Sequence, residues 1–238
     1  MNRKEVGAIV VFSKTPGYSP IKTRLAESIG QEYAEKFHRI SVDILKTKLR
    51  GIAGLATYWA VAEEEALSAP TWSDVSTIRQ GTGDLGSKLH HVYSSLLQHH
   101  DFVLMIGTDC PHLQLESISG SMTILSNWEL NPSSGKFVMG RCQDGGFYLF
   151  GGDTPISGEI WNAVAYSQNT TGKDLAKKVS TLGTIQYLME SFDVDTIEDL
   201  LSLQRLCLSD DSLRRKFGDY FVEVFNKAHV KVEAEEVP

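Results

Sequence analysis

Short runs of apolar, mostly β-branched residues alternate along this chain with longer segments of helical periodicity. Two of these runs, Gly7–Phe12 (GAIVVF) and Phe102–Ile106 (FVLMI), end abruptly at turn residues. Runs of this length and composition are typical of buried parallel strands. The intervening segments Gln31–Leu49 and Leu85–Gln98 carry apolar residues three or four positions apart, which predicts helices. The alternation predicts an α/β domain with a mostly parallel sheet.

The same criteria predict the remaining elements. Further strands are expected over Leu55–Val61, Val75–Arg79, Lys136–Met139, Phe147–Phe150 and Gln186–Phe192, and further helices over Thr23–Ile29, Ser117–Leu125, Glu159–Val164, Thr171–Leu182, Thr196–Leu208 and Ser212–Phe225. No internal repeat or linker-like stretch divides the chain. We therefore expect a single domain over residues 1–230 and a charged, frayed tail over residues 231–238.

Composition excludes several classes of protein. The 238 residues carry a formal net charge of −7, which disfavours non-specific binding to nucleic acid. The three cysteines are far apart and form no CxxC pair, which argues against a disulfide framework or a zinc knuckle. The chain lacks the roughly 20 consecutive apolar residues of a membrane span and the hydrophobic region of a signal peptide. We expect a soluble, cytoplasmic protein.

Ligands of open α/β sheets bind beyond the carboxyl ends of the strands, so the residues that follow each apolar run matter most. The first run leads into a basic loop that contains Lys14, Lys22 and Arg24. Backbone N–H groups of such a loop and the N-terminus of the next helix favour anions, and three cations strengthen that preference. The loop matches neither the P-loop pattern nor GxGxxG. The alternative is a solvated loop with ordinary surface lysines.

Aspartates follow two other predicted strands. Asp109 comes directly after the run at 102–106, where a carboxylate can bind Mg²⁺ together with substrate phosphates; alternatively, it caps the following turn. Asp193 and Asp195 flank Val194, and side chains two apart in an extended segment point the same way. Asp195 or Thr196 also suits the N-cap of the next helix, so one group can cap while the other reaches a metal.

Two glycine-containing stretches complete the candidate site. Asp144, Gly145 and Gly146 precede an aromatic run, as in a hairpin turn, and their small size also permits close approach of a substrate. The stretch from Gln80 to Gly86 (QGTGDLG) leaves room for a base or sugar, or is simply a flexible loop. Cys142 is interpreted as a bystander, and His112 has no obvious partner in the sequence.

The ordered set of motifs resembles one family. The sequence contains KTRL at 22–25, GDLG at 83–86, GTDCP at 107–111, DGGFYL at 144–149 and DVDTIEDL at 193–200. This order, from about Val6 to Leu200, resembles the bacterial DUF2064 proteins, which are glycosyltransferase-A-like members of the nucleotide-diphospho-sugar transferase superfamily. Ser19 departs from the glycine usual in the family's loop, and His112 departs from the usual acidic or small residue.

The resemblance implies a Rossmann-like mixed, mostly parallel sheet with helices on both faces. It also implies that Lys14, Lys22 and Arg24 hold phosphates, that Asp109 and Asp195 bind Mg²⁺ or Mn²⁺, and that Gln80 and Gly86 lie near the base. Asp144, Gly145 and Gly146 are expected to contact substrate.

The expected function is that of a metal-dependent transferase acting on a nucleotide or nucleotide-sugar and an unknown acceptor. Lys22, Arg24 and Asp109 are the expected catalytic residues, since phosphate chemistry depends mainly on positioning and charge stabilisation. Glycosyl transfer from a nucleoside-diphosphate sugar is preferred. One alternative is a nucleotidyltransferase that condenses a nucleoside triphosphate with a phosphorylated acceptor. The other is a non-catalytic protein that binds a nucleotide.

Overall fold

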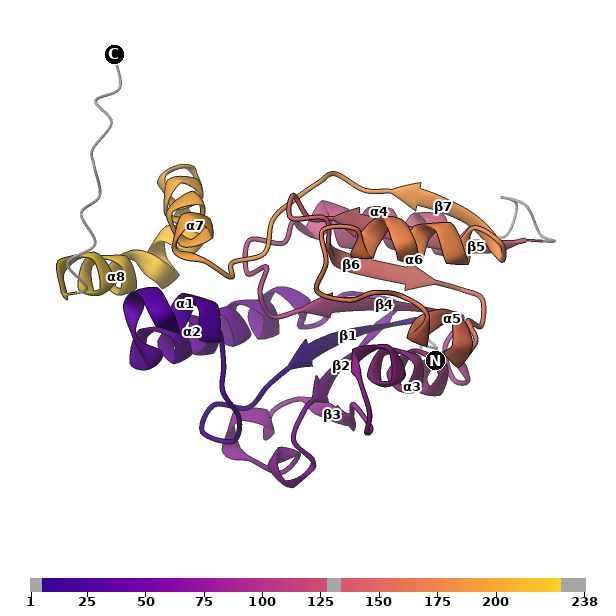
Figure 1. Ribbon diagram of the computed structural model, residues 1–238, viewed down its shortest axis with the longest axis horizontal. Helices are drawn as coiled ribbons and strands as arrows, with labels where there is room; N and C mark the ends of the chain where they lie inside the picture. The colour runs from indigo at the N-terminus through magenta and orange to yellow at the C-terminus, as the bar shows by residue number, and fades with distance from the viewer. Residues whose placement is uncertain (1–5, 128–133, 228–238) are drawn as a thin grey trace, which may run out of the picture.

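A seven-stranded sheet organises the chain, and its strands lie in the order β3-β2-β1-β4-β6-β5-β7 (Figure 1). The computed structural model describes residues 6–127 and 134–227, so the tail expected over 231–238 lies outside the described residues. The strands are β1 (Gly7–Ser13), β2 (Leu55–Val61), β3 (Ser76–Arg79), β4 (Phe102–Gly107), β5 (Gly135–Arg141), β6 (Phe147–Gly152) and β7 (Gly183–Tyr187).

Most strand pairs are parallel. In the centre, β1 pairs in parallel with β2 on one side, with Gly7 opposite Leu55, and with β4 on the other, with Gly7 opposite Phe102. Strand β6 is antiparallel to both β4 and β5, and a hairpin joins it to β5. The predicted mixed, mostly parallel sheet is therefore confirmed.

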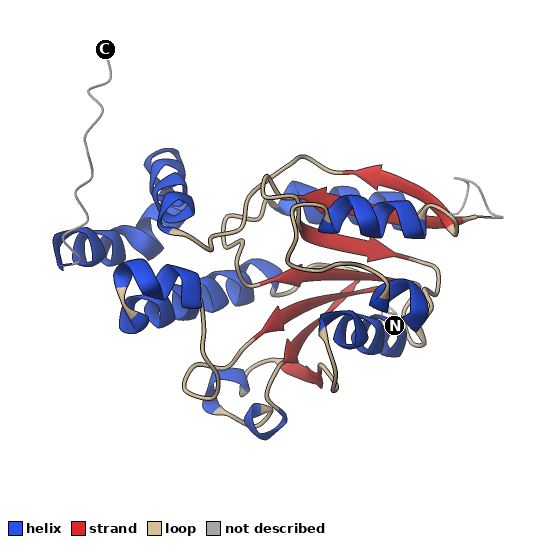
Figure 2. Cartoon of the chain, viewed as in Figure 1, coloured by secondary structure: helices blue, strands red, loops and turns tan. Residues whose placement is uncertain are grey.

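Helices cover both faces of the sheet (Figure 2). The helical elements are α1 (Thr23–Ile29), α2 (Gln31–Leu49), α3 (Leu85–Leu97), α4 (Leu115–Ser126), α5 (Gly158–Asn162), α6 (Thr171–Val179), α7 (Ile197–Ser209) and α8 (Asp211–Lys227), with short 3-10 helices η1 (Glu64–Ala66) and η2 (Pro70–Trp72). Alternate residues of β1 point to opposite faces, as the strand period requires. Ile9 and Val11 join the core beneath α2 and α4, whereas Ala8 and Val10 join the core beneath α3, α5 and α6.

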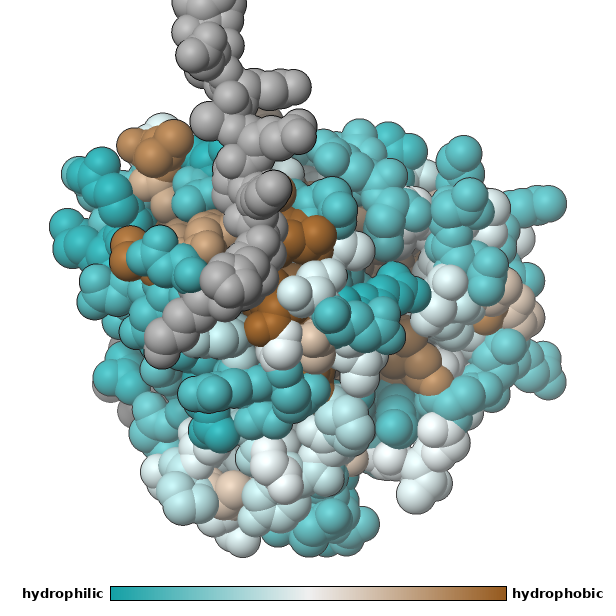
Figure 3. Space-filling view, turned by 60° about the vertical axis from the view of Figure 1, so that its left-hand side comes forward, coloured by the Kyte–Doolittle hydropathy of each residue, from teal (hydrophilic) through white to brown (hydrophobic). Residues whose placement is uncertain are grey.

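A third apolar cluster lies beside the sheet, where α7 and α8 pack against α1 and α2 (Figure 1). The ring of Phe37 on α2 stacks on that of Phe217 on α8, with ring centroids 5.6 Å apart. Figure 3 turns this end of the molecule forward and shows hydrophobic side chains among hydrophilic ones; Leu208 of α7 and Val222 of α8 are exposed. Among the described residues, no helix combines the length and apolar character needed to cross a membrane.

The predicted elements differ from the structure mainly at one edge. The last strand was expected over Gln186–Phe192, but β7 runs from Gly183 to Tyr187. This prediction was wrong because β7 is an edge strand whose residues are partly or fully exposed, so it lacks the apolar composition of a buried strand. The 3-10 helices η1 and η2 were not predicted, since three-residue turns leave no periodic pattern.

Candidate functional site

The candidate site lies where the carboxyl ends of β1 and β4 meet. From β1 the chain continues to β2 and β3 on one side of the sheet, and it then returns to place β4 on the other side of β1. Strands β1 and β4 are therefore the neighbours between which the strand order reverses. Crevices at such reversal points are the usual ligand sites of open α/β sheets. The basic loop follows β1, and Asp109 follows β4, so the fold brings these two predicted segments together.

A buried carboxylate fixes the basic loop. The N–H of Tyr18 donates to the carbonyl of Thr15 at 3.1 Å and closes a turn in which Gly17 has a φ of 87°. Glu63, only 9% exposed, accepts a hydrogen bond from the Thr15 N–H at 2.9 Å and another from the Ser19 hydroxyl. Ser19, the departure from the family's usual glycine, therefore tethers the loop to Glu63.

Lys22 lies at the centre of the site. Its side chain is 4% exposed, and its backbone is left-handed with φ 51°, an unusual conformation for a residue with a Cβ. The ammonium donates to Oδ1 of Asp109 at 2.8 Å, to Oδ1 of Asp195 at 2.7 Å and to the carbonyl of Val194 at 2.5 Å. A lysine ammonium has three donors, so these three acceptors use all of them.

The ion pairs determine the charge states of this group. Burial disfavours the charged form of Lys22, but the two nearby carboxylates outweigh burial and raise the pKa of the ammonium. Burial likewise opposes ionisation of Asp109, but the Lys22 ammonium outweighs it and lowers the pKa of that carboxyl. The lysine is thus a permanent cation between two carboxylates.

The segment that carries Asp195 is tied to the end of β4. The N–H of Val194 donates to the carbonyl of Asp109 at 2.9 Å. Thr196 is the N-cap of α7 and forms a capping box with Asp199. Capping by Thr196 leaves the Asp195 carboxylate for Lys22, which resolves the choice between these two residues that the sequence left open.

A buried histidine on α2 contacts the backbone of the same loop. His38 of α2 is 3% exposed, and its Nε2 lies 3.0 Å from the carbonyl of Lys14. Burial lowers the pKa of this imidazole. Sequence reasoning missed both His38 and Glu63. Glu63 lies two residues beyond β2, so applying the strand-end rule to that strand would have found it.

Two cavities of opposite charge open at this edge of the sheet. The first, the basic cavity, has a volume of about 640 Å³, and its charged lining comprises Lys14, Lys22, Arg24, Lys88, Asp109 and Asp195, with His38 beside them. The second, the acidic cavity, has a volume of about 440 Å³, and its charged lining comprises Arg24, Asp144, Asp193 and Asp195. Arg24, Ser167 and Asp195 line both, so the cavities adjoin.

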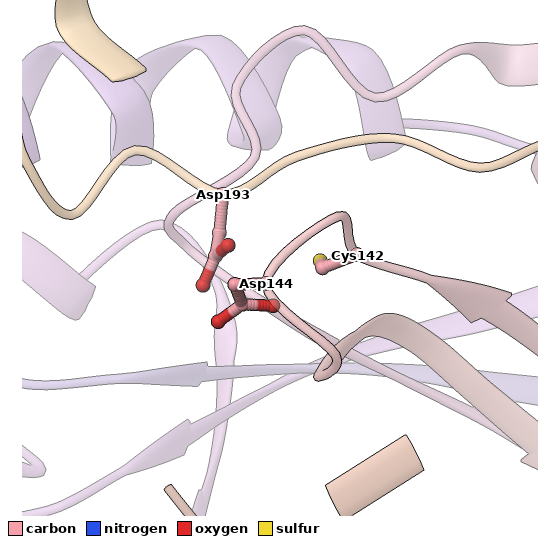
Figure 4. A group of neighbouring side chains, drawn as sticks. All are labelled: Cys142, Asp144 and Asp193. Carbon is pink, nitrogen blue, oxygen red and sulfur yellow. The ribbon is translucent and has the colours of Figure 1, made fainter. Parts of the chain in front are cut away.

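Asp144, Asp193 and Cys142 lie close together (Figure 4), and the two aspartates line the acidic cavity. A carboxylate oxygen of each aspartate and the Cys142 sulfur all lie within 4.8 Å of one another. Burial and the neighbouring charge of Asp144 raise the pKa of Asp193 to about 6. Burial also raises the pKa of the Cys142 thiol, so the group offers carboxylates rather than a thiolate.

The glycines of the β5–β6 hairpin pack against the chain itself. A Cβ on Gly145, whose φ is 92°, would lie 1.9 Å from the carbonyl oxygen of Asn169, and Gly172 donates its N–H to the carbonyl of Gly145 at 2.9 Å. The hairpin expected from the sequence is present. The expected space for a substrate beside Gly145 is instead filled by the loop before α6, whereas Asp144 and Gly146 line the acidic cavity.

Gln80 and Gly86 are both buried. Gln80 donates its side-chain amide to the carbonyl of Ala60 at 2.8 Å while lining the basic cavity. A Cβ on Gly86 would meet the carbonyl oxygen of Trp161 at 2.8 Å. Gly86 therefore allows α3 to pack closely on α5 and does not leave open space for a base.

His112, which had no evident partner in the sequence, has partners in the fold. Its Nε2 lies 3.2 Å from the Ser191 hydroxyl, and its ring stacks on Phe192 with centroids 4.1 Å apart. These contacts hold the chain just before Asp193.

Comparisons with known proteins agree with this architecture. Residues 49–168, just over half of the chain, match the family model described as an uncharacterized protein conserved in bacteria (DUF2064). No curated protein matches the chain.

Solved structures show the same fold at low sequence identity. A "putative nucleotide-diphospho-sugar transferase" from Desulfovibrio desulfuricans G20 superposes with a TM-score of 0.77 at 20% identity, covering 92% of this chain and 97% of that one. A CMP:2-keto-3-deoxy-manno-octonic acid synthetase complexed with CTP has a TM-score of 0.51 at 12% identity and coverage of 86% and 99%. The 4-diphosphocytidyl-2C-methyl-D-erythritol synthase from Anaerococcus prevotii DSM 20548 has a TM-score of 0.52 at 8% identity and coverage of 83% and 94%. With the motifs, the sheet and the family match in agreement, the chain belongs to the DUF2064 family and has the nucleotide-diphospho-sugar transferase fold.

Proposed function

We propose that this chain is a metal-dependent transferase that acts on a nucleotide or nucleotide-sugar, with glycosyl transfer from a nucleoside-diphosphate sugar preferred. The observation that carries the proposal is the pair of adjoining cavities of opposite charge, which share Arg24 and Asp195. A transferase needs neighbouring sites for donor and acceptor, and the basic cavity suits the anionic donor.

The basic cavity suits the phosphates of a nucleotide. Its volume of about 640 Å³ falls within the usual range for small-molecule sites. The Arg24 side chain is 67% exposed, so its guanidinium can turn toward a phosphate, and Lys14 lines the same wall. Arg24 lies in the first turn of α1, and the Lys14 ammonium donates to the carbonyl of Pro20 in the loop just before that helix, at 2.8 Å.

Asp109 and Asp195 fit a hard divalent cation. Their side chains are 39% and 37% exposed at the cavity wall, and the contacts with Lys22 use one oxygen of each. Oδ2 of Asp195 also lies 4.0 Å from the guanidinium of Arg24, whose side chain is 67% exposed. Carboxylate oxygens are the ligands that Mg²⁺ and Mn²⁺ prefer. Bound there, the ion would neutralise phosphate oxygens and stabilise the leaving group.

The charge of the acidic cavity favours glycosyl transfer. Three aspartates and one arginine line it, together with the aromatic side chains of Phe147, Tyr148 and Tyr166. This lining disfavours a phosphorylated acceptor and favours one that presents hydroxyl groups. In this reaction the acceptor oxygen would form a bond to the sugar's anomeric carbon, the bond to the nucleoside diphosphate would break, and the acceptor proton would pass to solvent or a carboxylate.

Nucleotidyl transfer is the second candidate, supported by the fold shared with a synthetase bound to CTP. There the acceptor oxygen would attack the α-phosphate, and pyrophosphate would leave. Product analysis separates the candidates: glycosyl transfer releases a nucleoside diphosphate from a nucleotide-sugar, and nucleotidyl transfer releases pyrophosphate from a triphosphate. Binding without either product across broad panels of donors and acceptors would support a non-catalytic nucleotide-binding protein instead.

Asp109→Asn tests the donor site. We expect the substitution to reduce Mg²⁺-dependent nucleotide affinity at least 100-fold in calorimetry, since it removes a metal ligand and a partner of Lys22. Asp101→Asn is the matched control, because Asp101 is exposed at the opposite end of the same strand. Unchanged nucleotide affinity in the Asp109 variant would remove this residue from the site.

A further inference from the structure

The ammonium of Lys22 lies between the carboxylates of Asp109 and Asp195 and contacts both of them. Its ammonium lies 2.8 Å from Oδ1 of Asp109 and 2.7 Å from Oδ1 of Asp195, and its third donor is fixed on the carbonyl of Val194. The side chain is 4% exposed and therefore cannot turn into solvent without a change in the surrounding packing. In this conformation Lys22 has no donor left for a phosphate.

The anchoring of this lysine is built into the fold. Its backbone adopts the left-handed conformation immediately before α1, and its ammonium lies over the ring of Phe37, 6.0 Å from the centroid. The acceptor segment is fixed independently, because the Val194 N–H donates to the carbonyl of Asp109 and Thr196 caps α7. The ammonium thus enters a preformed group of oxygens.

A divalent ion bound by the same two carboxylates would lie within a few ångströms of this ammonium. The two cations would repel each other, and the repulsion is strong where little water screens it. Phosphate oxygens beside the metal would add negative charge and offset the repulsion. The metal-free pair, by contrast, is already partly neutralised by Lys22.

We infer that Lys22 is a resident cation of the Asp109–Asp195 pair, which holds the carboxylates together before metal binding and weakens the binding of a divalent ion in the absence of phosphates. This inference rests on the proposed function for the identity of the site. It makes Lys22 a positioning residue that sets the order of binding, because the metal binds with high affinity only together with the anionic donor.

The test measures binding of Mn²⁺ alone, by the loss of its free electron paramagnetic resonance signal, with the whole chain and no nucleotide. Lys22→Met removes the charged end of the side chain and keeps an unbranched stem, and we expect the variant to bind Mn²⁺ at least tenfold more tightly than the wild type. Lys88→Met is the matched control, since Lys88 lines the same cavity, and it should change the affinity by less than about twofold. The double variant K22M/D109N should lose the gain.

An increase in affinity distinguishes this role from a merely structural one, because a loosened site would bind metal less well. If Lys22 were only a phosphate ligand, Lys22→Met would bind Mn²⁺ alone as the wild type does, and the inference would be overturned. The inference would also be overturned if the double variant K22M/D109N still bound Mn²⁺ more tightly than the wild type. Lys22→Gln, which is neutral but still a donor, provides a second variant and should also gain affinity.

If neither variant folds without metal, thermal unfolding in the presence of Mn²⁺ decides the question. Restoration of a cooperative transition by Mn²⁺ supports the inference, and failure to restore it overturns the inference. The outcome is separable from that of the proposed function. A chain without transferase activity can still show the gain in Lys22→Met, and an active transferase can lack it.

Discussion

Lys22 and His112 are two ionisable side chains that this fold buries, with opposite results for their charge. Lys22 remains charged because two carboxylates contact its ammonium. His112, which is 4% exposed, has no carboxylate among its contacts described above; burial and the nearby Lys48 lower its pKa to about 4. Burial alone therefore does not determine whether a side chain is charged. The charged groups that lie beside the buried side chain determine it.

The lowered pKa of His112 predicts a loss of stability in acid. The imidazole titrates near 6.5 in the unfolded chain and near 4 in the folded one, so the unfolded state binds more protons between these values. Its contribution is fully present above pH 6.5 and is lost as pH falls toward 4, by an amount on the order of 3 kcal/mol. Urea unfolding across this pH range measures it.

His112→Phe keeps an aromatic ring against Phe192 and removes the titration. We expect its free energy of unfolding to depend less steeply on pH between 4 and 6.5 than that of the wild type. His99→Gln, at an exposed position, serves as the control. An identical pH dependence in wild type and His112→Phe would show that another group causes the acid sensitivity.

The sequence predicts which residues stand at the site better than it predicts what they contact. Lys14, Arg24, Asp109 and Asp195 were identified because each lies just beyond a predicted strand or at the start of a helix, and all four line the basic cavity. The partner of Lys22 at Asp195 is 173 residues away in sequence, so no local pattern reveals that the lysine is already paired. Long-range contacts of this kind depend on the completed fold.

At the scale of elements, the β5–β6 hairpin and the loop before α6 form a unit beside the acidic cavity. Gly145 has a left-handed backbone and lies against the Asn169 carbonyl, so two independent constraints require glycine there. Gly17, in the basic loop, is also left-handed, but an added Cβ would meet no atom within 4 Å. Comparing substitutions at Gly145 and Gly17 therefore distinguishes the cost of backbone strain from the cost of steric overlap.

Gly145→Ala should destabilise the chain more than Gly17→Ala. Backbone strain costs both variants about 1 kcal/mol, and the overlap with Asn169 should add about 2 kcal/mol or more for Gly145→Ala. Denaturant unfolding of the two variants measures the difference. Equal losses of stability would mean that the loop before α6 moves aside without cost and is not held by the hairpin.

Elements whose signal is local were predicted well, and those defined by their neighbours were not. The buried strands β1 and β4 and the long helices α2 and α3 follow directly from composition and period. The edge strand β7 was displaced because it lacks that composition. The alternation of strands and helices predicts parallel strands, so only the short turn at Asp144–Gly146 indicated that β6 is antiparallel to β5.

At the scale of the whole molecule, the site joins three parts of the chain that are far apart in sequence. The loop after β1 brings the cations, the end of β4 brings Asp109, and the segment before α7 brings Asp195. The third apolar cluster, in which α7 and α8 pack on α1 and α2, holds the first and last of these parts together. The arrangement brings motifs that are spread over most of the sequence to the one donor site proposed above.

The central claim is that a divalent ion and the phosphates of a nucleotide bind at this junction. A crystal structure after soaking with Mn²⁺ and a panel of nucleotides and nucleotide-sugars tests it most directly. The account predicts anomalous density for manganese at bonding distance from Asp109 and Asp195, with phosphate density beside Arg24. Manganese at Asp144 and Asp193 alone, or nucleotide bound away from the basic cavity, would contradict it.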